Sequence, residues 1–87
     1  MPKRTHGTVI GINPKTSRIA IKVDFGDISI LEVDDTSDFE INHVLYGDLE
    51  QEGGNLIFNK TEKTEHHVYI QATGCDYETA QYQLFRA

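Results

Sequence analysis

The sequence predicts an all-β domain, a small antiparallel barrel of five or six strands with a short C-terminal helix. Short apolar runs alternate with clusters of Gly, Pro, Asn and Asp, which is typical of strands joined by tight turns. Residues 18–25 (RIAIKVDF) alternate apolar and polar side chains, as a half-buried strand does. From residue 76 onward the apolar spacing becomes that of a helix.

Six runs are expected to form the strands: residues 7–12, 18–25, 28–33, 43–50, 55–60 and 64–72. Pro14 marks the turn between the first two, because it fixes φ and lacks a backbone donor. In the third run Ile28 and Ile30 share one face, while Leu31 and Val33 lie on the other. Either a bulge shifts the register there or both faces of this strand are covered.

The helix is expected over about residues 76–86. Asp76 is a favourable N-cap residue, and Glu78 in the first turn complements the helix dipole. One helical face carries Tyr77, Ala80, Gln81, Leu84 and Phe85. We expect the apolar members of this stripe to be buried against the barrel.

Length and composition are those of one domain spanning residues 1–87, with 38% hydrophobic and 25% charged residues. No apolar run approaches the roughly 20 residues that span a bilayer. The basic opening residues are followed by no apolar stretch, and the single cysteine, Cys75, can form no internal disulfide. These features predict a cytoplasmic protein that makes no membrane contact.

Charge is distributed unevenly along the chain. Residues 1–22 carry five basic side chains and no acidic one, whereas all fourteen acidic residues follow from Asp24 onward, with three basic ones. The formal net charge of −6 conceals this asymmetry. Segregated charge concentrates electrostatic potential on one surface, where a partner can dock.

The opening third of the chain resembles the first three strands of a cold-shock-type OB barrel. The matching scaffold positions are Gly7, Val9, Ile12, Asn13, Ile21, Asp27, Ile28 and Ile30. The resemblance supports a barrel of OB or SH3-like type. The family's base-stacking aromatic residues are replaced here by Gly11, Arg18, Ala20, Ser29 and Leu31. Because stacking contributes roughly 1–3 kcal/mol per base, the resemblance implies the fold without that family's mode of binding.

Lys15, Arg18 and Lys22 in the first hairpin are the candidate nucleic-acid-binding residues. Basic side chains of this kind can follow a phosphate backbone without reading its sequence. The alternative interpretation is a solvated strand edge, where lysine discourages association between strands.

Other groups suggest chemistry less directly. Adjacent strand residues His66 and His67 point to opposite faces and so cannot share a metal ion without a bulge. The loop with Asp34, Asp35 and Asp38 lacks the ligand spacing of a calcium loop. Cys75 precedes a helix, where its thiolate could be stabilised, or it is simply a small packed residue. We therefore expect no catalytic residue, no metal and no cofactor.

Four aromatic residues, Tyr46, Phe58, Tyr69 and Tyr77, could form a patch outside the core, or they could serve packing in a chain without tryptophan. Fold alone does not decide function, since small barrels bind proteins, nucleic acids and sugars. The sequence predicts a non-enzymatic binding module, with another protein as its expected partner. Sequence-tolerant binding of single-stranded nucleic acid through the first hairpin is the alternative.

Overall fold

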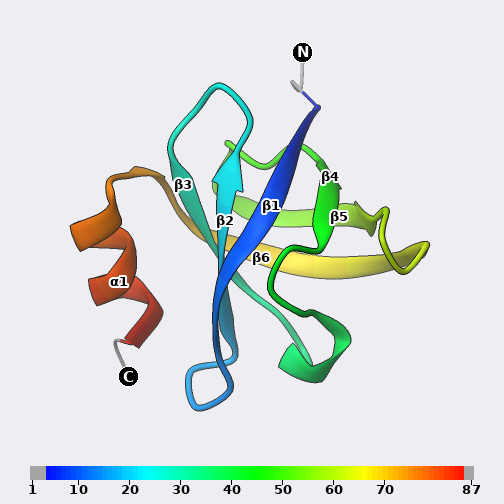
Figure 1. Cartoon of the computed structure of the whole chain (residues 1–87), viewed down its shortest axis with the longest axis horizontal. Coiled ribbons are helices and arrows are strands. Elements are labelled where there is room, and N and C mark those ends of the chain that lie inside the picture. The colour runs from blue at the N-terminus through cyan, green and yellow to red at the C-terminus, as the bar shows by residue number, and fades with distance from the viewer. Residues whose placement is uncertain (1–3, 86–87) are drawn as a thin grey trace.

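The computed structural model describes residues 4–85, and in it six antiparallel strands close into a barrel (Figure 1). The strands are β1 (Thr5–Asn13), β2 (Arg18–Val23), β3 (Ile28–Glu32), β4 (Val44–Gly47), β5 (Gly53–Asn59) and β6 (Thr64–Cys75). A 3₁₀ turn, η1 (Thr36–Asp38), follows β3, and the helix α1 (Tyr77–Phe85) follows β6. The predicted barrel and C-terminal helix are confirmed; residue 86 of the predicted helix lies outside the described residues.

The barrel consists of two three-stranded meanders that meet at both edges. Their order around the barrel is β1-β2-β3-β6-β5-β4, and every pairing is antiparallel. The β1–β4 pairing and the β3–β6 pairing join the meanders. Within the described residues, no helix is long and apolar enough to cross a membrane.

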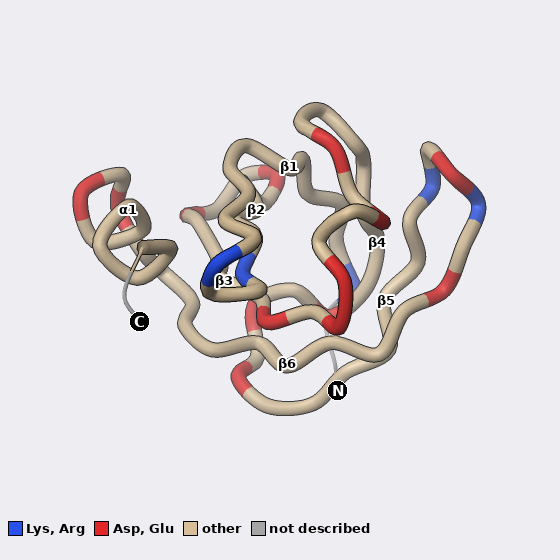
Figure 2. Tube along the Cα trace, turned by 90° about the horizontal axis from the view of Figure 1, so that it is seen from below, with Lys and Arg blue, Asp and Glu red and all other residues tan. Residues whose placement is uncertain are grey.

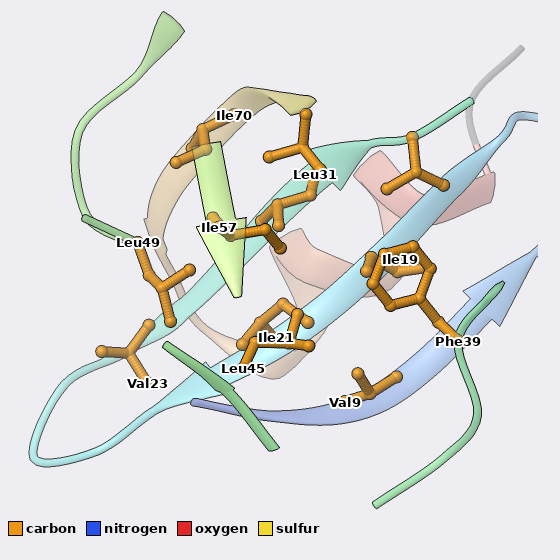
Figure 3. Close-up of a cluster of buried hydrophobic side chains, with 12 residues drawn as sticks. Val9, Ile19, Ile21, Val23, Leu31, Phe39, Leu45, Leu49, Ile57 and Ile70 are labelled. Carbon is orange, nitrogen blue, oxygen red and sulfur yellow. The ribbon is translucent and has the colours of Figure 1, made fainter. Parts of the chain in front are cut away.

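The interior of the barrel is filled by aliphatic side chains from all six strands, with one aromatic ring (Figure 3). The buried members are Val9, Ile19, Ile21, Val23, Leu31, Val33, Phe39, Leu45, Leu49, Ile57, Val68 and Ile70. On β2 they are the residues expected from the alternation of the sequence, because side chains of a strand point alternately to its two faces.

Strand β3 is covered on both faces, which resolves the ambiguity in its sequence. Leu31 points into the barrel, and so does Ser29, whose Oγ donates to the Leu49 carbonyl at 2.6 Å. Ile28 and Ile30 lie on the outer face beneath α1. The register against β6 also shifts on either side of Ile30, so coverage and irregular pairing occur together.

The helix rests on a second apolar cluster on the outside of the barrel. Its buried members are Ala20, Ile28, Ile30, Cys75, Ala80 and Leu84. The expectation that Tyr77 and Phe85 are also buried is wrong, since they are 71% and 62% exposed. A nine-residue helix meets the convex barrel along a short line through Ala80 and Leu84. Its terminal residues extend past that line, and Phe85 is rotated about 100° from Leu84.

The N-terminus of α1 is capped as the sequence predicts. Asp76 Oδ1 accepts a hydrogen bond from the Thr79 N–H at 2.8 Å, and the Asp76 carbonyl accepts one from the Ala80 N–H. The bond from Thr79 lowers the pKa of the Asp76 carboxyl below its ordinary value, because it favours the charged form.

The C-terminus of α1 is held by side chains of the first hairpin. Thr16 Oγ1 and Asn13 Nδ2 donate to the Leu84 carbonyl, at 2.8 and 3.2 Å. Arg18 Nη1 donates to the Gln83 carbonyl at 2.7 Å. The last carbonyls of a helix have no partner within it, so these bonds fix the helix on the barrel.

Candidate functional site

Arg18, a predicted nucleic-acid-binding residue, is engaged within the fold. Besides its bond to Gln83, its guanidinium forms an ion pair with Glu32, with Nη2 and Oε2 at 3.0 Å. Its side chain is only 13% exposed. A phosphate would have to replace these contacts in order to bind Arg18.

The other two basic candidates, Lys22 and Lys15, differ in their contacts. Lys22 Nζ donates to the carbonyls of Val23 and Gly26, and so closes the turn after β2. Lys15 is exposed in the turn between β1 and β2. Arg18 thus links β2 to β3 and α1, Lys22 stabilises the turn between β2 and β3, and Lys15 extends into solvent.

His66 and His67 lie on opposite faces of β6, as expected. The His66 ring is half-buried beside Phe39, with 4.8 Å between ring centroids, while His67 is exposed. His66 Nδ1 is 3.9 Å from Asp38 Oδ2. Among residues 4–85, no group of three or more His, Cys, Asp or Glu side chains is arranged to hold a metal ion.

A buried polar pair that the sequence did not reveal fastens the loop before β4. Asn59 is fully buried, and its Nδ2 is 3.0 Å from His43 Nδ1. The Glu40 N–H donates to the same Nδ1, so that nitrogen is an acceptor and Nε2 carries the proton. Nε2 lies 3.5 Å from Glu62 Oε2. These groups complete one another's hydrogen bonds, and their role is structural.

The acidic loop after β3 owes part of its shape to Asp35. Its Oδ1 accepts from the backbone N–H and the hydroxyl of Ser37, at 2.9 and 2.8 Å. These bonds cap η1 and lower the pKa of the Asp35 carboxyl. The Asp35 carboxylate therefore stabilises the turn. Asp34 and Asp38 are the other aspartates of this loop.

Cys75 is a buried, packed residue and not an activated thiol. It belongs to the cluster beneath α1, and burial raises the pKa of its thiol above the ordinary value. The negative charge of Asp76 raises it further. At neutral pH the unreactive thiol form is thus favoured over the thiolate.

We expect iodoacetamide to alkylate Cys75 at pH 8 at least about tenfold more slowly in the folded protein than in urea. Both the shielding and the raised pKa of the folded state act in this direction, since only the exposed thiolate reacts. Mass spectrometry of timed samples measures the two rates. Equal rates would show that the cluster beneath α1 opens freely.

The four aromatic candidates do not form one patch. Tyr46 pairs with Phe58 across β4 and β5, and both are half-buried. Tyr69 lines a cleft over β5 and β6, whereas Tyr77 lines another beside α1. The interpretation of a single aromatic surface is therefore wrong.

A groove lined by charged groups lies between the loop after β3 and strand β6. An open outer part of about 540 Å³ and a narrower inner part of about 180 Å³ adjoin along Val33, Asp34 and His67. We call the whole the acidic groove; its lining comprises residues 32–35, 38–39, 54–56 and 65–69.

Carboxylates dominate the charge of the acidic groove. Five line it, of which the first is paired with Arg18 and the other four are not: Glu32, Asp34, Asp35, Asp38 and Glu65. No Lys or Arg is among the lining residues. Figure 2 shows acidic positions along the loop that follows β3. The groove thus presents negative potential to a partner.

The groove forms where the pairing between β3 and β6 ends. Their register ends at the pair Glu32–Tyr69. The Val33 N–H donates to the carbonyl of Ser17, just before β2, and the chain then turns toward η1. Strand β6 continues away from this loop toward its hairpin with β5 (Figure 1). The unequal lengths of the two strands leave the groove between them.

Comparisons with known proteins add no relative to this description. A scan against protein-family models, a search of curated proteins and a search of solved structures each find no match. The geometry of the chain itself is what bears on function.

Proposed function

We propose that the chain is a non-enzymatic protein-interaction module that docks a positively charged partner in the acidic groove. The observation that carries the proposal is the groove's lining, which holds five carboxylates, one of them (Glu32) paired with Arg18, and no Lys or Arg. Complementary charge speeds encounter with a basic partner and suppresses acidic ones. Two exposed apolar side chains on the same lining, Leu56 and Tyr69, offer contact area beyond charge.

The contacts of the basic residues favour a protein over a nucleic acid. Arg18 and Lys22 already bond to groups of the fold, and the net charge is −6. A polyanion would meet repulsion from the carboxylates unless it bound on a different face. Single-stranded nucleic acid on the first hairpin is therefore the competing outcome of the test.

The test compares two probes at about 50 mM salt, using the ¹⁵N-labelled protein. One is an unstructured lysine-containing polypeptide of about 20 residues, and the other is a single-stranded oligonucleotide. We expect the polypeptide to perturb amide signals of residues 65–69. Binding of the oligonucleotide through about three phosphates would instead perturb the first hairpin, with a log–log salt slope near −2.

A matched pair of double variants locates the binding surface. D34N/E65Q removes two exposed groove carboxylates, and E52Q/E78Q removes two exposed carboxylates that do not line the groove. Each lost ion pair costs about 0.5 kcal/mol. D34N/E65Q should therefore weaken polypeptide binding by about fivefold, with little effect of E52Q/E78Q. Equal losses, or tighter binding of the oligonucleotide, would refute the proposal.

A further inference from the structure

We infer that the acidic groove receives its partner as an added β-strand, an extended basic segment that pairs with residues 64–68 of β6. This inference rests on the proposed function and specifies its binding mode. It starts from the pairing of β6, which has 12 residues. Residues 64–68 pair with β5 on one side, but the β3 register reaches only to Tyr69 on the other. Within residues 4–85, that part of β6 is an open edge.

The directions of the open backbone groups follow from the pairing of β3. Residues along a strand direct their N–H and C=O groups alternately to the two neighbouring strands. The Val33 N–H donates to the Ser17 carbonyl, so the backbone groups of Val33 point toward the β2 side. The N–H and C=O groups of Glu32, one residue earlier, therefore point toward β6. The backbone groups of its partner Tyr69 consequently point toward β3. Those of His67 and Glu65, two and four residues earlier on β6, point to the same side.

The pairing of β6 with its other neighbour, β5, leads to the same directions for the backbone groups. The Lys60 N–H bonds to the Val44 carbonyl, so Lys60 and Phe58 face β4. Ile57 therefore faces β6, and its partner His66 faces β5. Glu65 and His67 are thus the residues whose N–H and C=O groups point into the groove. Exposed groups of this kind are a template for pairing with another chain.

The groove's shape and charge define the occupant. Side chains of an added strand alternate between the inner and outer faces. The inner part has a volume of about 180 Å³ and is lined by Val33 and Phe39 together with four carboxylates, so positions toward it accept only short side chains. Outer positions lie on the same face as the exposed Glu65 and His67, within reach of Asp34. The matching segment is extended and alternates Lys or Arg with small residues.

The test uses a seven-residue peptide, acetylated and amidated, that alternates lysine and alanine. Two further versions carry N-methyl groups, one on the lysine amides and the other on the alanine amides. An added strand directs only every second amide toward β6, so one version should lose binding by more than about tenfold while the other retains it. The three peptides have equal charge, so purely electrostatic docking would leave them equal and overturn the inference.

Hydrogen exchange supplies an independent readout on the unaltered protein. Binding of the unmethylated peptide should slow exchange of the Glu65 and His67 amides, while those of His66 and Val68 stay as they were. Protection that is absent, or spread over all four amides alike, would contradict strand addition. If the long polypeptide binds the groove but this peptide gives neither result, the mode is wrong and the proposed function stands; if neither binds, both fail.

Discussion

Truncation after Cys75 is expected to lower the free energy of unfolding by about 5 kcal/mol, because it removes the cover from the outer face of the sheet. Leu84 is lost, and Ile28 and Ile30 become exposed. Each large apolar side chain contributes about 1.5–3 kcal/mol when fully buried. The total free energy of unfolding of a small domain is only about 5–15 kcal/mol, so the truncated chain should be barely stable. Urea unfolding followed by circular dichroism measures the change.

Two point variants keep this prediction testable if the truncated chain does not fold. Leu84→Ala should cost about 3 kcal/mol, because Leu84 is buried against the barrel. Phe85→Ala, one residue along, should cost under about 1 kcal/mol, since Phe85 is 62% exposed. If the two variants were equally destabilised, or the truncated chain kept its unfolding midpoint, the packing of α1 described above would be wrong.

Ile70→Ala is expected to lower the free energy of unfolding by about 4 kcal/mol. Ile70 is fully buried in the barrel core on β6. Truncation to Ala removes transfer free energy and leaves a cavity, and such changes cost about 2–5 kcal/mol. The same urea titration measures the loss.

The matched control for Ile70 is Leu56→Ala, on the outer face of β5. Leu56 is 48% exposed, so we expect a cost below about 1 kcal/mol. A cost for Leu56 close to that for Ile70 would mean that the outer face of β5 is covered in solution. Because Leu56 also lines the acidic groove, this variant should reduce peptide binding while leaving the fold intact.

Those parts of the fold that depend on local pattern were predictable. The alternation of residues 18–25 gave β2 its inner face, and Asp76 marked the start of α1. The two faces of β3 could be read only as alternatives, because the cover on Ile28 and Ile30 comes from α1, far along the chain. Local spacing contains no information about such a distant layer.

The candidate site was less predictable for the same reason. The alternation of its strand predicts that Arg18 faces solvent. Its guanidinium instead donates to the carbonyl of Gln83, which lies 65 residues later in the sequence. The acidic groove depends on where the β3–β6 register ends, which is a property of two strands together. Asp34 and Glu65 belong to separate runs of the sequence, and only the divergence of these strands places both on one groove.

The bonds that fasten the end of α1 also bear on the order of folding. Asn13 and Leu84, which are joined by one of them, are 71 residues apart in the sequence. Closing so long a loop must precede any gain from the contact, and non-local contacts of this kind slow folding. During synthesis the first hairpin emerges long before its helical partner. The outer faces of β2 and β3 therefore stay uncovered until α1 has been synthesised.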